Sequence, residues 1–277
     1  MFLQIWDKIK FHTKYSVNYE TAELITLAAK AVKDMDETKK PSIRSTKKKV
    51  VITDEGIEGQ LLSDSGKDDY NYHIDMPDML GYIQSKTELT RSTILEIIKK
   101  SGRISEVLIN PQLFMDNIVS SIRQVLYALM IEGIKYEKIG GKIYEMKLFD
   151  DNELEIYVDK FTHTVLQPGK TIYENLIPLQ SDVESEFAKD CESSENIEFY
   201  FKLPFWFKIQ TPIGPYNPDW AIVFKDEKKI YFVAETKSAG QELRGSEKLK
   251  IKCGKEHFKE FDDVVYKRVA TVSELTK

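Results

Sequence analysis

Charged residues stand at the ends of two apolar segments in the last quarter of the chain. One segment begins directly after Asp219, and the other ends in Glu235-Thr236-Lys237. Segments that are apolar nearly throughout are typical of buried strands, so charged residues at their ends require a separate explanation. Side chains alternate between the two faces of a strand, so Glu235 and Lys237 share one face and Thr236 lies on the other.

The charged stretch 225–229 joins the two segments and predicts a β-hairpin. In a hairpin the first strand begins beside the end of the second, so we expect Asp219 to lie beside Glu235. Two carboxylates and an ammonium at one edge of a sheet form a hard-oxygen site that suits Mg²⁺, and Mn²⁺ can substitute for it. The alternative is a surface hairpin with charged ends, because Glu-x-Lys arises often in a chain that is 31% charged.

A helix is predicted shortly before the hairpin. Ser181 is a good N-cap, and Glu184 follows it by three residues as in a capping box. Val183, Phe187 and Cys191 recur at helical spacing, and Glu184 lies on the flank of this apolar stripe. Glu184 therefore has two interpretations, a capping residue or a further site carboxylate.

A row of cationic residues follows the second apolar segment at helical spacing. Its members are Arg244, Lys248, Lys252, Lys255 and Lys259. Lysine and arginine on one helix face supply sequence-independent affinity for phosphates, which predicts DNA contact. The alternative is a solvated face, because glutamates are interspersed along the same stretch.

Composition limits the possible classes of protein. A chain of 277 residues that is 42% hydrophobic can form one large or two ordinary domains. The net charge of −5 excludes a global basic field, so any affinity for DNA must come from local patches. Cys191 and Cys253 form no metal-binding spacing or disulfide framework, which is typical of a reducing cytoplasm. The apolar runs are too short to span a membrane.

The chain is expected to divide near residue 160. Residues 1–160 are predicted to form a mostly helical region. Residues 161–277 are predicted to form a mixed sheet flanked by helices, so that the fold class is α+β or α/β. The first region is expected to contain helices at 21–33 and within 77–130, a polar loop at 34–49, and a β-hairpin at 134–149 that turns at Gly140-Gly141.

Five segments, in this order, resemble the C-terminal endonuclease region of the Res subunit of type III restriction enzymes. They are Ser-Asp-Val-Glu-Ser-Glu-Phe-Ala (181–188), Lys-Leu-Pro-x-Trp-Phe-Lys-Ile (202–209), Thr-Pro-Ile-Gly-Pro-Tyr-Asn-Pro-Asp-Trp-Ala (211–221), Val-Ala-Glu-Thr-Lys (233–237) and Cys-Gly-Lys-Glu-His-Phe (253–258). Segments of the first half are similar too, so the resemblance spans most of the chain. It implies a PD-(D/E)xK nuclease fold and site-specific endodeoxyribonuclease activity.

The resemblance implies roles for particular residues. Asp219, Glu235 and the backbone carbonyl of Thr236 are expected to bind Mg²⁺, with Lys237 orienting or deprotonating the attacking water. The helix before the strands is expected to add a carboxylate, Glu184, with Glu186 in reserve. Arg244, Lys248, Lys252 and Lys255 are then expected to contact double-stranded DNA.

The resemblance also implies a larger parent protein with an ATP-driven helicase-like motor and a methyltransferase partner subunit, Mod. A chain of 277 residues has no room for the two RecA-like domains of such a motor. Gly169-Lys170-Thr171 is not a Walker A loop, because the first glycine of that loop would fall at Thr164. We interpret Gly169-Lys170-Thr171 as a turn. ATP is therefore expected to bind only to the parent protein, of which the chain is expected to be a fragment or truncated product.

Two alternatives to this function remain open at this stage. One is a stand-alone PD-(D/E)xK nuclease of a resolvase or repair type. The other is a non-catalytic adaptor that couples a motor to a partner subunit, with the 1–160 region as the adaptor.

Overall fold

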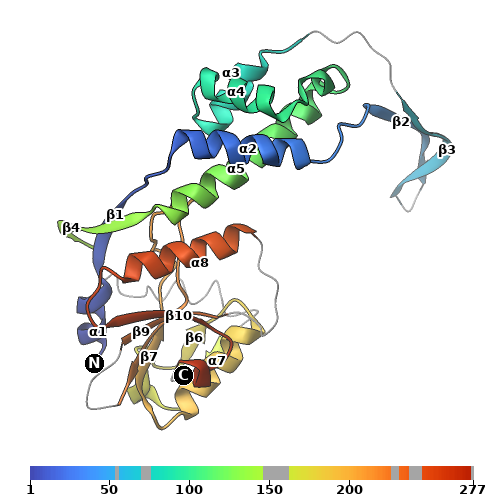
Figure 1. Cartoon of the computed structure of the whole chain (residues 1–277). Coiled ribbons are helices and arrows are strands. Elements are labelled where there is room, and N and C mark those ends of the chain that lie inside the picture. The colour runs from blue at the N-terminus through green and yellow to red at the C-terminus, as the bar shows by residue number, and fades with distance from the viewer. Residues whose placement is uncertain (54–55, 70–75, 146–161, 226–230, 237–244, 276–277) are drawn as a thin grey trace. The chain divides into compact units, whose positions relative to one another are not determined.

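The computed structural model of this chain describes residues 1–53, 56–69, 76–145, 162–225, 231–236 and 245–275. The chain forms two compact units, coloured along the sequence in Figure 1. The helical unit comprises Tyr19–Leu129, and the sheet unit comprises Met1–Asn18 together with Met130–Lys277. The first eighteen residues thus belong with the C-terminal part, whereas the sequence placed them in a separate region that ends near 160.

The helical unit contains the helix predicted at 21–33, which the structure forms as α2 (Thr21–Asp34). Its other helices are α3 (Met79–Thr87), α4 (Arg91–Ser101), the 3₁₀ helix η1 (Ile104–Leu108) and α5 (Pro111–Glu132). Thr90 caps α4 by accepting a hydrogen bond from the Thr93 amide. Apolar side chains at helical spacing, such as Leu24, Ala28 and Val32, are fully buried.

The helical unit also contains two long antiparallel strands, β2 (Ser42–Thr53) and β3 (Gly56–Asp69). The loop expected over 34–49 is therefore shorter, because β2 begins at Ser42. The polar residues of this segment do not prevent strand formation, since a strand needs only a backbone partner and extended geometry.

A four-stranded sheet organises the sheet unit. Its strand order is β10-β9-β8-β7. The strands are β7 (Ile197–Lys202), β8 (Trp220–Phe224), β9 (Tyr231–Thr236) and β10 (Val264–Val269). β7, β8 and β9 pair antiparallel, and β10 pairs parallel to β9. The predicted hairpin is confirmed by the pairing of Trp220 with Ala234 across β8 and β9.

Two helices cover opposite faces of this sheet (Figure 1). They are α7 (Asp182–Ser193), the helix predicted from the capping pattern, and α8 (Gly245–Phe258). Phe187 of α7 lies 5.7 Å from the Trp220 ring, and Phe258 of α8 stacks on Tyr266 of β10 at 5.7 Å. All five residues of β8 are buried, as expected for a central strand between two helix layers.

The segment predicted as a hairpin at 134–149 is arranged differently. In the part the structure describes, it forms one strand, β4 (Lys135–Ile143), which pairs antiparallel with β1 (Phe11–Ser16). The register shifts between Phe11 and Thr13, so Gly140 and Gly141 belong to an irregularity within a strand instead of a two-residue turn. Pairing with a distant strand therefore overrides the local turn preference of Gly-Gly.

Short strands and 3₁₀ helices lie before and after the main sheet in the described part of the sheet unit. β5 (Thr162–Thr164) pairs with β6 (Leu176–Pro178), and η3 (Val272–Glu274) follows β10. Between β5 and β6, the predicted turn at 169–171 is confirmed as the 3₁₀ helix η2 (Pro168–Lys170). Lys170 donates hydrogen bonds to the carbonyls of Glu192 and Ser194 at 2.7 Å, which caps the C-terminus of α7.

The aromatic residues near β7 form the core of the sheet unit. α1 (Phe2–Ile9) packs onto them, with Phe2 at 5.0 Å from Phe201 and Trp6 at 5.6 Å from Trp206, measured between ring centroids. Phe201 and Phe207 are fully buried, which favours a packing role for them over a base-stacking one. Among the described residues, no helix is both long and apolar enough to cross a membrane.

Candidate active site

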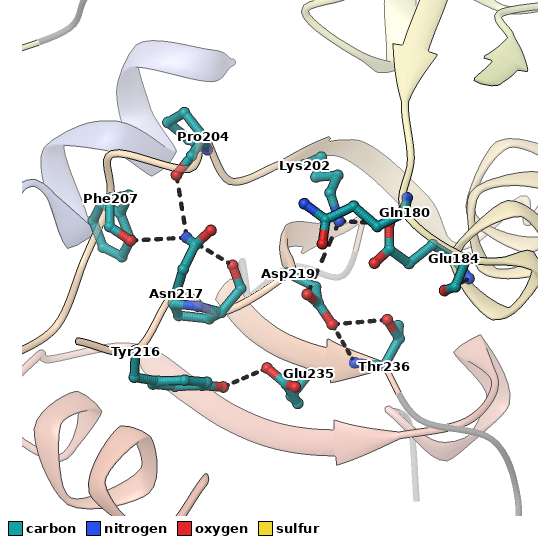
Figure 2. A network of polar contacts seen from close by, with 12 residues as sticks. Gln180, Glu184, Lys202, Pro204, Phe207, Tyr216, Asn217, Asp219, Glu235 and Thr236 are labelled. Atoms are coloured by element: carbon teal, nitrogen blue, oxygen red, sulfur yellow. Dashed lines mark hydrogen bonds and ion pairs between the residues drawn. The ribbon is translucent and has the colours of Figure 1, made fainter. Parts of the chain in front are cut away.

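Asp219 lies directly before β8 and beside the end of β9. Its backbone carbonyl accepts a hydrogen bond from the Leu203 amide at 2.8 Å, which extends the β7–β8 pairing past the strand end. Its Oδ2 atom accepts two hydrogen bonds of 2.8 Å from Thr236, one from the amide and one from the hydroxyl. The structure therefore brings Asp219 to the Glu235-Thr236 end of β9, as the strand register of a hairpin requires (Figure 2).

Asn217 fixes the turn that delivers Asp219. Its side-chain amide donates to the carbonyls of Phe207 at 2.8 Å, Pro204 at 3.1 Å and Pro218 at 3.2 Å (Figure 2). Saturating the carbonyls of an irregular segment with one side-chain amide restricts its backbone. Sequence analysis assigned no role to Asn217, although a turn of prolines around one asparagine is the available signal.

Glu235 lies in a buried environment built from tyrosines. It is 6% exposed, and its Oε2 atom accepts a hydrogen bond of 2.6 Å from the Tyr216 hydroxyl. The Tyr216 hydroxyl lies 2.5 Å from that of Tyr266. Burial, together with the nearby Glu235 carboxylate, raises the pKa of both tyrosines well above the usual value, so both stay protonated as donors.

α8 approaches this tyrosine pair closely enough to require glycine. A Cβ atom on Gly254 would lie 2.7 Å from the Tyr216 ring and 3.1 Å from the Tyr266 ring. No side chain fits in that space, so glycine at position 254 allows α8 to pack directly against both tyrosine rings. The position of Glu235 thus depends on packing between α8 and the sheet.

Glu184 takes part in the capping of α7 and also contacts Lys202. Its amide donates to the Ser181 hydroxyl at 3.3 Å, which completes half of a capping box. Its Oε2 atom accepts from the Gln180 amide at 2.9 Å and from the Lys202 ammonium at 2.6 Å. Glu186 instead pairs with Lys189 on the exposed side of α7, so Glu184 is the glutamate that reaches this group.

Lys202 links Glu184 to Asp219. Its Nζ atom lies 2.6 Å from Glu184 Oε2 and 3.9 Å from Asp219 Oδ1 (Figure 2). It also lies 5.4 Å from the centroid of the Trp220 ring, and the side chain is only 12% exposed. Sequence analysis missed Lys202, and the only signal was a cation at the end of the apolar strand 197–201.

Residues 169–272 match a family model described as an endonuclease domain. An endonuclease domain is therefore present in the sheet unit, and the match supports a restriction-type domain with DNA as its substrate. The matched region includes Glu184, Lys202, Asp219 and Glu235. Searches of curated proteins and of solved structures found no match.

The lysine row predicted to contact DNA lies on α8 of the endonuclease domain. Lys248, Lys252 and Lys255 are exposed, as DNA contact requires. Lys259 is exposed as well, but it pairs with Glu256 at 2.7 Å. Arg244, the first member of the row, lies outside the described residues.

The donor chemistry of the endonuclease domain fits a divalent cation. Carboxylates are the ligands that Mg²⁺ prefers, and an ammonium already lies between two of them, Glu184 and Asp219. In the described part of the chain, however, no three His, Cys, Asp or Glu side chains are grouped closely enough to hold a metal ion. Lys237, the last member of the sequence motif, lies outside that part.

Proposed function

We propose that the sheet unit is a Mg²⁺-dependent PD-(D/E)xK endonuclease that hydrolyses phosphodiester bonds in double-stranded DNA. The observation that supports this proposal is the contact of Asp219 with Thr236, the residue after Glu235, within the region that matches an endonuclease domain. The sequence resemblance makes it the cleavage part of a type III restriction enzyme Res subunit.

In this proposal Asp219 and Glu235, with the backbone carbonyl of Thr236, hold the metal ion, and Glu184 holds a second ion or a water molecule. When bound, Mg²⁺ lowers the pKa of water and neutralises charge on the phosphate. Thr236 orients Asp219 through two hydrogen bonds, and Tyr216 orients Glu235 through one.

Water then attacks the phosphorus atom in line with the departing 3′ oxygen, leaving a 3′-hydroxyl and a 5′-phosphate. Lys237 orients this water or accepts its proton, and it stabilises charge on the phosphate. Buried Tyr216 reduces the access of water to Glu235, which strengthens the interaction of this carboxylate with a cation.

The proposed partners follow from the resemblance. Arg244, Lys248, Lys252 and Lys255 contact the DNA backbone, and their small number in a chain of net charge −5 means that the affinity is low without further subunits. An ATP-driven helicase-like motor and the Mod methyltransferase subunit deliver DNA to the site in the cytoplasm. The helical unit serves as the adaptor to these partners.

The test is nicking and cleavage of supercoiled plasmid by the full chain with Mg²⁺ or Mn²⁺. The proteins are wild type, Asp219→Ala, Glu235→Ala and, as a control, Lys189→Ala on the exposed side of α7. Cutting that requires metal, persists in the control and is lost in both site variants supports the proposal.

Calorimetric titration with Mn²⁺ covers the case of a site that needs its partners to load DNA. Binding by wild type that is lost in Asp219→Ala supports the metal site even without plasmid cutting. The absence of both cutting and metal binding in wild type would overturn the proposal in favour of a non-catalytic scaffold.

A further inference from the structure

The Lys202 ammonium occupies a position with anionic or π-electron partners on three sides. Glu184 Oε2 is 2.6 Å away, Asp219 Oδ1 is 3.9 Å away, and the Trp220 ring centroid is 5.4 Å away. The side chains of Lys202, Glu184 and Asp219 are 12%, 8% and 19% exposed, so water screens these charges only in part. A cation thus already lies between two of the carboxylates assigned to the metal site.

The backbone fixes this position. Lys202 is the last residue of β7 and pairs with Trp220 of β8, and the Leu203 amide then bonds to the Asp219 carbonyl. Backbone pairing therefore holds Lys202, at the end of β7, next to Asp219, directly before β8. α7 supplies Glu184, whose carboxylate is also tied to the Gln180 amide. Lys202 lies in a strand and Glu184 in a helix, and Asp219 lies in the segment directly before β8.

Two consequences follow for a divalent ion that binds to Asp219. The ammonium neutralises part of the negative charge that attracts the ion, and it uses an oxygen of Glu184 that an ion would otherwise bind. The Trp220 ring stabilises the ammonium beside the site by a cation–π interaction, so its charge stays nearby after an ion enters.

We propose that Lys202 is a resident cation that holds Glu184 and Asp219 together without metal and competes with the divalent ion for these carboxylates. Lys202 thereby sets the metal affinity of the site and keeps it below what the carboxylates alone would give. This inference rests on the proposed function, in which both carboxylates serve the metal site. Lys202 is a positioning residue in this scheme, because it acts through the ligands.

The test measures Mn²⁺ affinity and thermal unfolding of the full-length chain. Lys202→Met removes the charge while keeping the length of the side chain. Its control is Lys189→Met, because Lys189 pairs with Glu186 on α7 at 2.6 Å, the same distance, but in an exposed position. Lys202→Arg keeps the charge, and Lys202→Gln is a second neutral variant with an amide that can still donate to Glu184.

We expect both neutral variants to bind Mn²⁺ at least about tenfold more tightly than wild type, because a like charge close to the ion has been removed. Without metal, their unfolding temperatures should fall below that of wild type, since Glu184 and Asp219 lose their shared counter-charge. Saturating Mn²⁺ should raise these temperatures by more than it raises that of wild type. Lys189→Met and Lys202→Arg should bind Mn²⁺ about as wild type does.

The outcomes separate this inference from the proposed function. If wild type binds Mn²⁺ through Asp219 but neither neutral variant binds it more tightly, the competition is overturned and the nuclease proposal stands. Tighter binding by Lys202→Arg as well would overturn the charge argument. If wild type binds no Mn²⁺, the metal site and the inference that depends on it both fail. Should Lys202→Met not fold, Lys202→Gln decides the comparison.

Discussion

α7 carries two buried glutamates near its opposite ends, and their surroundings differ. The side chains of Glu184 and Glu192 are 8% and 5% exposed, so burial does not distinguish them. Glu192 shares a hydrogen bond of 2.8 Å with His163 and accepts two from the amides of Leu166 and Gln167, at 2.7 and 2.6 Å. Both carboxylate oxygens of Glu192 therefore already accept hydrogen bonds from groups that are fixed parts of the fold.

Among the residues that the structure describes, Glu184 receives hydrogen bonds on one oxygen only, from the Gln180 amide and the Lys202 ammonium. One of these donors is a lysine ammonium that lies next to a second carboxylate, Asp219. Glu192, whose oxygens are bound by backbone amides and a histidine, stabilises the fold. Glu184, which is bound by an ammonium, can exchange that cation for a metal ion. The identity of the partners, more than burial, therefore distinguishes a structural carboxylate from one suited to a metal site.

The largest expected effect concerns stability at the Glu192 end. Glu192→Ala should lower the free energy of unfolding of the sheet unit by about 3 kcal/mol, because buried His163 and two part-buried amides lose their acceptor. All three tryptophans of the chain, Trp6, Trp206 and Trp220, lie in the sheet unit. Urea unfolding followed by tryptophan fluorescence therefore reports on this unit.

The matched control is Glu186→Ala, on the same helix. Glu186 is exposed and forms an exposed ion pair with Lys189, so the change should be within about 0.5 kcal/mol. Equal stability of the two variants would contradict the structural role of Glu192.

The next effect concerns cleavage at the Glu184 end. Glu184→Gln should reduce metal-dependent plasmid cutting by about 100-fold, because the neutral amide no longer supports a cation at the reacting phosphate. Its free energy of unfolding should change by less than about 2 kcal/mol, since the amide oxygen still accepts from Gln180 and Lys202. Initial cutting rates and urea unfolding of the same samples measure both quantities.

Glu186→Gln is the control for this variant, since Glu186 was the reserve candidate from the sequence. It should cut as wild type does. An equal loss of cutting in both glutamine variants, or a loss only in Glu186→Gln, would contradict the assignment of the site carboxylate to Glu184.

The sequence predicted the parts of the site that depend on local patterns. The alternation of side chains and the length of the connecting stretch placed Asp219 beside the end of β9, and the capping pattern placed Glu184 in the first turn of α7. Both predictions use residues that are neighbours along one strand, hairpin or helix. Local geometry is enough to fix them.

The features that sequence analysis missed depend on contacts between distant segments. Lys202 meets Glu184 across 18 residues, and a lysine at a strand end gives no sign of that partner. The parallel strand β10 was not predicted, because it pairs with β9 across a connection that contains α8, and no local pattern signals such a distant pairing. Gly140-Gly141 favours a hairpin locally, and only the distant strand β1 makes it an irregularity of β4.

The smallest expected effect is the acid dependence of the Glu192 contribution. Burial raises the pKa of Glu192, but hydrogen bonds from Gln167, His163 and Leu166 outweigh burial and lower this pKa below its usual 4.5. A folded-state pKa below the unfolded one contributes stability above pH 4.5, and this stability is lost as pH falls through the folded pKa. Wild type should therefore lose up to about 1.4 kcal/mol per pH unit below pH 4.5 through this group.

Glu192→Ala should lack this part of the pH dependence, so the difference in unfolding free energy between wild type and the variant should narrow between pH 5 and about pH 3. Urea unfolding at a series of pH values measures the difference, with Glu186→Ala as the control that should stay parallel to wild type. A constant difference in unfolding free energy between wild type and Glu192→Ala across this range would show that the ionised form of Glu192 stabilises the fold no more than its protonated form does. The contrast between Glu192 and Glu184 would then not depend on the charge of Glu192.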